Sequence, residues 1–524
     1  MRVILITPPY DKRRFRVGES LGLKYLATVL DQKVTSAVVL EPTLMGWGVT
    51  ETVEEIQRLG CDVLGISLQF SHGLYNAVKV IERIKKDLNP HITMGGHFAS
   101  FHYDELLAAI PQLDSIVMFE GEETVCQLVE MLEKKSDWDN ISGLAYRGRN
   151  GLVVRTKSRP LIRNLNDLPF PRRDGTSRLG GEAHYGMISS RGCLFCCTFC
   201  SVPFFYDTPG GPRWRVRSPG NVVDEMEYLV KLHGAEEISF FDDNFLGSNK
   251  IGEKRAIQIA NEIVSRGLAV KWSIESRTDD INSSLLSVLK TAGLRHINLG
   301  IESGDQRVLD RLRKLTKVSG NLAAIEEVRD LGLSAYYHFI MFNADTTVEE
   351  IEASLDFIRV AGIGNFSVIS NRLDVYRGTP EFNRLQQEGR IRKQGYEYSF
   401  KFRDGTVEMI YQAIHRSLRG LFRVELAIQQ KGFALDTGIQ IETVRNHFLM
   451  PSSSQDQPLN DLQNELSDRT CDFAASIVSF LKHHPKVTKS VFDSLTYSIR
   501  IECEAFSAQM LDKIIPVPNE DSEL

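Results

Sequence analysis

The sequence predicts an α/β protein with a doubly wound N-terminal domain, a central sheet of parallel βα units and a mostly helical C-terminal region. Three observations lead to this prediction. Short β-rich runs alternate with helices over roughly the first 150 residues, the alternation returns after residue 187, and it stops near residue 400. We place the divisions at residues 1–140, 141–180, 181–400 and 401–524, with 141–180 as a connector.

The first domain is predicted from five β-rich runs and the helices between or after them. The runs are Val3–Ile6, Ala37–Leu40, Val63–Ser67, Ile92–Gly95 and Ser115–Met118, and the helices are Leu21–Asp31, Thr52–Leu59, Leu74–Lys86 and Thr124–Lys134. A doubly wound sheet binds its ligand beyond the carboxyl ends of its strands. The residues found there are Thr7, Ser67, Gln69, Ser71, Gly95, Gly96, His97, Ser100, Glu120 and Gly121. No GxGxxG motif follows the first run, so we do not expect a dinucleotide.

The central region contains six short apolar runs, and a helix follows each of the first five. The runs are Met187–Ser190, Glu237–Phe241, Val270–Ile274, His296–Gly300, Ser334–Phe342 and Asn365–Ile369. Such βα units form one parallel sheet that closes as a full or partial barrel, with ligand loops at the carboxyl ends of the strands. Polar residues follow three of the runs, at 242–244, 275–277 and 302–304. Each could be a helix N-cap, but their recurrence favours a polar rim that binds a ligand.

The region beyond about residue 400 gives weaker signals. Thr406–Leu426 and Asp472–His483 have the pattern of amphipathic helices. The stretch at 451–463 is rich in Ser, Pro, Asn and Gln and predicts a linker. We expect this region to cover the barrel.

Composition and the N-terminus limit the compartment and the partners. The formal net charge is −6 and there is no long basic run, so we expect no nucleic-acid partner. The N-terminal apolar run, Val3–Ile6, is too short for a signal peptide or a membrane span. The 8 cysteines among 524 residues do not resemble the framework of a secreted protein. We therefore expect a cytoplasmic protein with no membrane partner.

Four of the eight cysteines lie in RGCLFCCTFC, residues 191–200. In a reducing compartment, clustered thiols indicate metal or redox chemistry rather than disulfides. A zinc site normally has a second Cys/His pair at a distance, and none follows here. Three thiolates on one short loop are better suited to a cubane iron–sulfur cluster. The spacing Cys193-x3-Cys197-x2-Cys200 leaves one iron open for a substrate.

This spacing, with Phe199 before the last cysteine, resembles the signature of the radical S-adenosylmethionine (SAM) superfamily. The resemblance implies a [4Fe–4S] cluster bound by Cys193, Cys197 and Cys200, with Cys196 outside the ligand set and SAM on the open iron. It also implies a (β/α)6 partial TIM barrel. The SAM contacts that it implies are Phe199, Asp243, Arg277 and Glu302, with Arg277 as the counter-ion of the SAM carboxylate.

The first domain resembles the Rossmann-like cobalamin-binding domain found upstream of many radical SAM enzymes. Ser67 and the stretch Gly95-Gly96-x3-Ser100 match positions that enclose the cobalamin nucleotide tail. The Asp-x-His-x-x-Gly motif of cobalamin-dependent mutases is missing, because no histidine precedes His72. Either cobalt has no protein imidazole below it, or cobalamin binding has been lost. His97 as a substitute axial ligand is the less favoured interpretation.

Together, these resemblances imply a cobalamin-dependent radical SAM methyltransferase that acts on an unactivated carbon of a small-molecule or peptide substrate in a biosynthetic pathway. An electron donor such as flavodoxin or ferredoxin is implied as a partner. The scheme needs no protein general base, so we assign no catalytic residue beyond the cluster ligands. One alternative keeps the cofactors but catalyses cyclisation or ring rearrangement, and another is a non-enzymatic cobalamin or iron–sulfur sensor.

Overall fold

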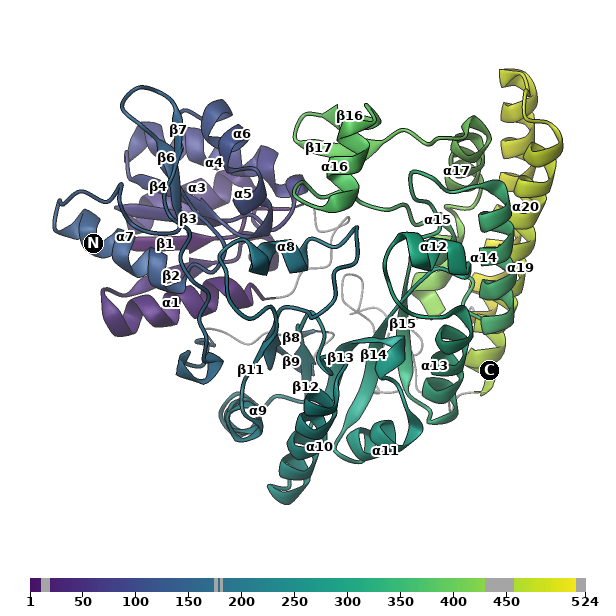
Figure 1. The fold of residues 1–524 in the computed structure, drawn as a ribbon, viewed down its shortest axis with the longest axis horizontal. Helices are drawn as coiled ribbons and strands as arrows, with labels where there is room; N and C mark the ends of the chain where they lie inside the picture. Colours follow the sequence, from purple (N-terminus) through teal and green to yellow (C-terminus); the bar gives the residue numbers. More distant parts are fainter. Residues whose placement is uncertain (11–18, 174–177, 180–181, 429–456, 515–524) are drawn as a thin grey trace, which may run out of the picture.

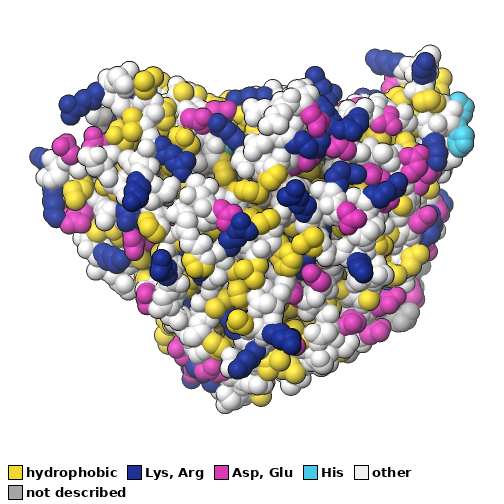
Figure 2. All heavy atoms as spheres, viewed as in Figure 1, with side chains coloured by type: hydrophobic (Ala, Val, Ile, Leu, Met, Phe, Trp, Pro, Cys, Tyr) yellow, Lys and Arg dark blue, Asp and Glu magenta, His cyan; other side chains and the backbone are white. Residues whose placement is uncertain are grey.

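The computed structural model describes residues 1–10, 19–173, 178–179, 182–428 and 457–514. Two sheets with their helices lie side by side, and a group of C-terminal helices covers the side of the second sheet that faces away from the first (Figure 1). The predicted α/β fold is confirmed. Lys and Arg side chains are interspersed with Asp and Glu over the face shown in Figure 2.

The first sheet has a parallel core in the order β2-β1-β3-β4-β5. These strands are β1 (Val3–Ile6), β2 (Ala37–Leu40), β3 (Val63–Ser67), β4 (His91–Gly95) and β5 (Ser115–Val117). All five predicted strands are therefore confirmed. Two antiparallel strands extend the sheet beyond β5, β6 (Leu144–Arg147) and β7 (Val153–Arg155), and both come from the segment expected as a connector.

Helices cover both faces of this sheet, which explains why its strands are apolar almost throughout. On one face, α1 (Leu21–Lys33) and α7 (Glu122–Glu133) pack on the side chains of Val3, Leu5 and Val63. On the other face, α3 (Val49–Leu59) and α4 (Leu74–Asp87) pack on the alternate strand residues. The order of the strands reverses between β1 and β3, and this reversal opens a crevice at their carboxyl ends.

The second sheet contains five parallel strands in chain order. They are β9 (Glu182–Met187), β12 (Glu237–Phe240), β13 (Lys271–Arg277), β14 (Leu294–Glu302) and β15 (Ser334–Phe339), with the short β8 (Arg178–Leu179) antiparallel to β9 at the edge. The helices that return the chain are α9 (Pro219–His233), α10 (Lys250–Ser265), α11 (Ser283–Thr291), α13 (Val318–Asp330) and α14 (Val348–Ala361). The sheet is an open, partial barrel.

Two element predictions for the barrel were wrong in detail. The run Asn365–Ile369, expected as the sixth strand, is the short helix α15 (Phe366–Ser370), because the Asn365 side chain caps it by accepting from the Val368 amide. A single parallel bridge between Phe342 and Arg372 occupies the sixth position. The first strand ends at Met187, so most of the run 187–190 lies after it.

The C-terminal region consists of long helices and one hairpin. The hairpin pairs β16 (Ile391–Gln394) with β17 (Glu397–Phe400), and the helices include α17 (Gly405–Ser417), α19 (Gln457–His483) and α20 (Lys489–Ile514). Because α19 begins at Gln457, the linker prediction is wrong for residues 457–463, and residues 451–456 lie outside the described residues. Among the described helices, none is both long and apolar enough to cross a membrane.

Candidate functional site

The cysteine loop lies at the carboxyl end of β9, as predicted. It follows β10 (Ser190–Arg191), which pairs with β11 (Arg215–Val216). All four of its cysteines are free thiols. The thiols of Cys193, Cys197 and Cys200 lie within electrostatic range of one another, and burial raises the pKa of each. A bound metal would favour the deprotonated form of these thiols.

Cys196 has a different hydrogen-bond partner from the other three cysteines of the loop. Its sulfur accepts a hydrogen bond from Nη1 of Arg213, which also pairs with Asp207. Among the described residues, no three His, Cys, Asp or Glu side chains converge as they would around a single metal ion. Cys193, Cys197 and Cys200 have the spacing of a cluster that distributes its ligands over separate irons, whereas the Cys196 sulfur is bound to Arg213.

Asp242 fixes the backbone directly before the cysteine loop. Its buried carboxylate accepts hydrogen bonds from the amides and hydroxyls of both Ser189 and Ser190, including 2.9 Å from Ser189 Oγ and 2.7 Å from Ser190 Oγ. The sequence motif FFDDNF predicted a polar strand end but not this function. Burial raises the pKa of Asp242, while Arg255 and the serine hydrogen bonds act against the shift.

The four residues predicted to bind SAM have different environments. Asp243 accepts from the Gly192 amide at 2.8 Å and lines a cavity together with Phe199. Burial raises the pKa of Asp243 to about 6. Arg277 is bound by Asp279 at 2.8 Å and donates to the Lys314 carbonyl at 2.6 Å.

Glu302 also has a protein partner, since its Oε1 lies 2.8 Å from Nζ of Lys314. Both side chains are buried. The backbone of Glu302 has φ of +65° at a bulge where β14 meets β15. Gly300 leaves room for this pair, because a Cβ there would lie 2.6 Å from the Lys314 nitrogen. A non-glycine residue in this conformation is strained, which is common at functional sites.

The interior of the partial barrel is polar, and apart from Glu275 its polar side chains were not singled out from the sequence. His184 bonds to Ser239 at 2.9 Å, and Ser239 bonds to Ser273 at 2.9 Å. Farther along the sheet, Glu275 accepts from Asn298 at 2.8 Å and lies 3.3 Å from Nε2 of His338. The signal was the alternation of polar with apolar residues in WSIES and HINLG. In a strand, every second side chain points to the same face, so the polar ones share the inner face.

A cavity of about 250 Å³ lies at the carboxyl ends of the first sheet. Most of the residues predicted for cobalamin line it, namely Ser67, Gln69, Gly95, Gly96, His97, Glu120 and Gly121. Gly96 has φ of +100°, and a Cβ there would lie 2.8 Å from the Leu68 carbonyl oxygen. Only glycine therefore fits this turn without strain.

The other three predicted residues do not line the cavity. Ser100 is buried, donates to the Gly96 carbonyl at 2.8 Å and accepts from the Phe119 amide at 2.9 Å, so it supports the glycine turn. Thr7 follows β1, and Ser71 lies in the short helical turn before α4.

Glu120 and His97 both make contacts with the barrel. Glu120 pairs with Arg191 at 3.0 Å and with Arg215 at 2.9 Å. His97 Nε2 lies 3.1 Å from Ser201 Oγ, and its ring stacks on Phe205 at 4.2 Å between centroids. Burial lowers the pKa of His97 to about 4, so its ring is neutral at pH 7.

A second cavity, of about 310 Å³, lies between the two domains. Its lining from the first domain is Gln69, Phe70, His97, Phe98, Phe101 and His102, and its lining from the barrel includes Phe199, Cys200, Asp243 and Tyr376. Ion pairs at its rim hold the halves together, since Arg377 binds Asp104 at 2.6 Å. We call the cavity at the carboxyl ends of the first sheet the cobalamin-type cavity. It shares Gln69 and His97 with this interdomain cavity, which Phe199 and Cys200 of the cysteine loop also line.

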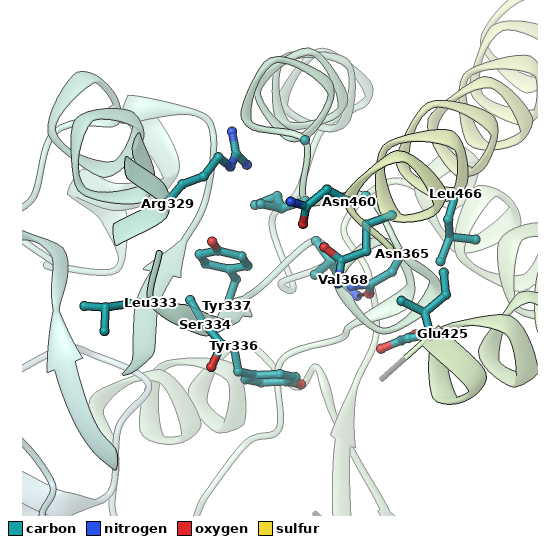
Figure 3. A pocket seen from close by; sticks show the side chains of 16 residues that line it. Arg329, Leu333, Ser334, Tyr336, Tyr337, Asn365, Val368, Glu425, Asn460 and Leu466 are labelled. Carbon is teal, nitrogen blue, oxygen red and sulfur yellow. Dashed lines mark hydrogen bonds between the residues drawn. The ribbon is translucent and has the colours of Figure 1, made fainter. Parts of the chain in front are cut away.

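Two further cavities lie along the free edge of β15. The larger, of about 640 Å³, is lined by polar and aromatic residues that include Arg372, Asp374, Tyr411 and His415. Asp374 of this chamber accepts a hydrogen bond from the Tyr376 hydroxyl, and Tyr376 lines the interdomain cavity. Figure 3 shows the smaller one, of about 150 Å³, between β15 and the C-terminal helices, with Tyr337 on one side and Leu466 on the other.

Comparison with known families gives two matches on this chain. Residues 187–358 match the Radical SAM superfamily, and residues 14–129 match the B12 binding domain. The first match begins at the last residue of β9 and includes the cysteine loop. The second contains nine of the ten residues predicted for cobalamin, all except Thr7. The two matches thus cover the cysteine loop and most of the first-domain residues that line the two cavities.

Individual relatives give the same result. An uncharacterized methyltransferase from Pyrococcus horikoshii is 31% identical over 373 residues, covering 68% of this chain and 78% of that protein. An anaerobic magnesium-protoporphyrin IX monomethyl ester cyclase from Rubrivivax gelatinosus is 29% identical over 387 residues, 68% of this chain and 66% of that one. A structure of the cobalamin-dependent SAM radical enzyme OxsB, with aqua-cobalamin and SAM bound, has a TM-score of 0.76 at 17% identity, covering 98% and 80%.

The two family matches assign a [4Fe–4S] cluster, SAM and cobalamin to this chain as its cofactors. The cysteine loop fits the cluster and SAM, and the cobalamin-type cavity, lined by Gly95, Gly96 and Gly121, fits cobalamin. This chain therefore belongs to the radical SAM superfamily, in the branch that joins a cobalamin-binding domain to the radical SAM barrel.

Proposed function

We propose that this protein is a methyltransferase that adds a methyl group to an unactivated carbon of a small-molecule or peptide substrate in a biosynthetic pathway of the cytoplasm. When bound, the cluster and SAM supply a 5′-deoxyadenosyl radical, and cobalamin supplies the methyl group. The relative from Pyrococcus horikoshii, named a methyltransferase, supports this choice. An electron donor such as flavodoxin or ferredoxin would reduce the cofactors.

The interdomain cavity is the observation that carries the proposal. It brings Cys200 and Asp243 of the radical SAM barrel to the same space as Gln69 and His97 of the cobalamin domain. Methylation requires that the substrate carbon reach both the radical source and the methyl donor. Phenylalanine side chains of both halves line this space, so they would exclude water from a reactive carbon radical.

The chain's own residues would hold the cluster and SAM as follows. Cys193, Cys197 and Cys200 are the proposed ligands, and Cys196 stays bound to Arg213. Asp242 orients the backbone that leads into the loop. Asp243 and Phe199 would contact SAM from the cavity wall. For Arg277 to bind the SAM carboxylate, it would have to share its guanidinium with Asp279.

Cobalamin would bind in the cobalamin-type cavity, with no histidine of this chain as a ligand of the cobalt. Among the described residues of the first domain, His97 is the only histidine that lines both the cobalamin-type cavity and the interdomain cavity. Its ring is held by Ser201 and Phe205. An electron paramagnetic resonance spectrum of the cob(II)alamin state should lack nitrogen superhyperfine splitting. Such splitting would contradict this proposal.

The chamber of about 640 Å³ is the best candidate for the substrate. A hydrogen bond from Tyr376 to Asp374 links it to the interdomain cavity, and polar side chains such as Arg372 and His415 share its wall with aromatic rings. This lining suits a polar small molecule better than a lipid.

A second candidate function keeps the cofactors but joins or rearranges rings without adding a methyl group. The relative from Rubrivivax gelatinosus, named a cyclase, is the observation that favours it. The two functions differ in what happens to SAM. Methylation yields one S-adenosylhomocysteine and one 5′-deoxyadenosine per product, whereas ring formation needs no methyl donor.

The decisive experiment supplies SAM with a deuterated methyl group, under strict anaerobiosis, together with candidate substrates. We expect a product that gains one labelled methyl group and near-equal amounts of the two SAM by-products. Both should vanish in the triple variant Cys193→Ala, Cys197→Ala, Cys200→Ala. A product without added methyl mass, formed with 5′-deoxyadenosine, would establish the second function instead.

A further inference from the structure

The cobalamin-type cavity is not built by the first domain alone. Three residues of the barrel half line it as well, Arg191, Phe205 and Tyr206. Phe205 and Tyr206 lie in α8 (Val202–Asp207), which begins two residues after Cys200. One short segment therefore continues directly from the cluster loop into the wall of the other cofactor's cavity.

Most polar groups on this wall already have protein partners. Arg191 binds Glu120 and Glu122, and Glu120 is further bound by Arg215 and by the Ile162 amide. The Tyr206 hydroxyl differs, because it forms no hydrogen bond with any of the residues that the structure describes. A phenol that lines a cavity and has no protein partner can donate to a ligand.

The Tyr206 ring is held rigidly although its hydroxyl is unpaired. The Arg215 guanidinium lies over it at 5.2 Å, and the Phe205 ring contacts it edge-on at 5.2 Å. Phe205 in turn stacks on His97 and meets Phe119 at 5.2 Å. A side chain that is fixed in advance loses little conformational entropy when a ligand binds.

Tyr206 also lies between the two cofactor sites. Ser201 and Val202, a few residues before it, line the interdomain cavity, whereas Phe205 and Tyr206 line the cobalamin-type cavity. Gly192, next to Cys193, packs against its ring, since a Cβ there would lie 3.3 Å from Cδ2 of Tyr206. A ligand held by Tyr206 would thus be tied to the position of the cluster loop.

We propose that the Tyr206 hydroxyl donates a hydrogen bond to cobalamin, so that the radical SAM half completes the cobalamin site. This inference rests on the proposed function, because it takes cobalamin as the occupant of the cavity. The carboxamide side chains and the phosphate of cobalamin are acceptors of the required kind. Cobalamin binding is then coupled to the order of the loop that carries the cluster cysteines.

The test measures binding of hydroxocobalamin to the full chain with its cluster reconstituted anaerobically. We expect Tyr206→Phe to weaken binding about fivefold, the effect of one hydrogen bond, and to retain its full iron content. Tyr206→Ala should weaken binding further, because it also removes part of the wall. Tyr228→Phe is the matched control, since Tyr228 lies in α9, lines neither cavity, and should bind as the wild type does.

Two results would overturn the inference. One is a Tyr206→Phe protein that binds hydroxocobalamin as tightly as the wild type. The other is a Tyr206→Phe protein that loses iron as well as cobalamin, which would mean a collapsed loop rather than a lost contact. A wild-type chain that binds its cluster but no cobalamin would instead contradict the cobalamin assignment itself, so the two failures are distinguishable.

Discussion

The two cofactor regions are built from different kinds of residue. In the first domain, the predicted residues that line the cavity are mostly glycines and small or amide side chains, such as Ser67, Gly95 and Gly96. In the barrel, the predicted Arg277 and Glu302 are charged, and each is already paired with a protein group. The site in the first domain is therefore an open cavity, whereas the site in the barrel consists of charged side chains that already have protein partners.

This difference shows which sequence signals predict a ligand site correctly. A glycine at a strand end predicts a cavity directly, because the missing side chain is what leaves the space. A charged residue at a strand end predicts a ligand only if no opposite charge lies nearer. Asp279 is two residues from Arg277, and Lys314 reaches Glu302 across the top of the barrel. The partner, rather than the residue type, decides the function.

The largest expected effect concerns the cluster. Cys197→Ala should abolish the brown chromophore and the bound iron, because a ligand to the cluster is lost. Cys196→Ala is the matched control, one residue away, and should retain both. Iron analysis and absorbance of anaerobically reconstituted protein provide the measurement. Equal loss of iron in the two variants would show that the ligand set is wrong.

A glycine substitution tests whether the first region is indeed a space. Gly96→Ala should abolish cobalamin retention, because its Cβ approaches the Leu68 carbonyl to 2.8 Å and displaces the cavity wall. Gly151→Ala is the control, since Gly151 also has a positive φ (+77°) but nothing within 4 Å of its Cβ. Both should lose roughly 1 kcal/mol of stability through backbone strain, but only Gly96→Ala should lose cobalamin. Retention by Gly96→Ala would contradict the cavity assignment.

Acid should destabilise the first region before the barrel. Burial lowers the pKa of His91, His97 and His102 to about 4, from an unfolded value of 6.5. The unfolded chain therefore binds more protons, and the stability of the first domain is lost as pH falls from 6.5 towards 4, at roughly 1–3 kcal/mol per histidine. In the barrel, burial also lowers the pKa of His233. Burial acts to lower the pKa of His338 too, but Glu275 raises it overall, so the contribution of His338 is lost as pH rises.

Hydrogen exchange at pH 7 and pH 4.5 measures this contrast. Amides of the strands β1 to β5 should lose more protection on acidification than those of β12 to β15. His91→Gln should reduce the pH dependence, whereas substitution of the exposed His483 should not change it. Equal loss of protection in the two sheets would refute the contrast.

The smallest expected effect tests Arg277 within the charge network. Asp279→Asn removes the carboxylate that competes for the guanidinium, so it should strengthen SAM binding to the cluster-loaded protein by about twofold to fivefold. Arg277→Lys should weaken binding to a similar extent, because it loses the planar fork that fits a carboxylate. Arg295→Lys, at an exposed position, is the control. If neither variant changes the SAM dissociation constant, Arg277 has a purely structural function.

Some features of this protein were determined by the sequence alone. The five strands of the first sheet were predicted because each is an apolar run bounded by turn residues, the pattern expected of parallel strands covered by helices. The cysteine loop was located by spacing, since the three cysteines of this signature lie within eight residues of one another. The glycine turn at residues 95–96 was also evident, because its function depends on a missing side chain rather than on a partner.

Other features were decided only by the tertiary structure, because they depend on residues far apart in the chain. The run Asn365–Ile369 is the helix α15, and its Ser367 amide donates to Glu425 Oε2 at 3.2 Å, a partner 58 residues away that periodicity over five residues could not reveal. Glu120 faces the predicted cavity but is neutralised by Arg191 and Arg215, which come from the other domain. Tyr206 gives no signal in the sequence, and it reaches the cobalamin-type cavity only because the two domains pack together there. The local sequence pattern therefore predicts most helices and strands and the polar residues at their ends. Long-range packing decides which charged side chains are paired and which polar groups remain available to a ligand.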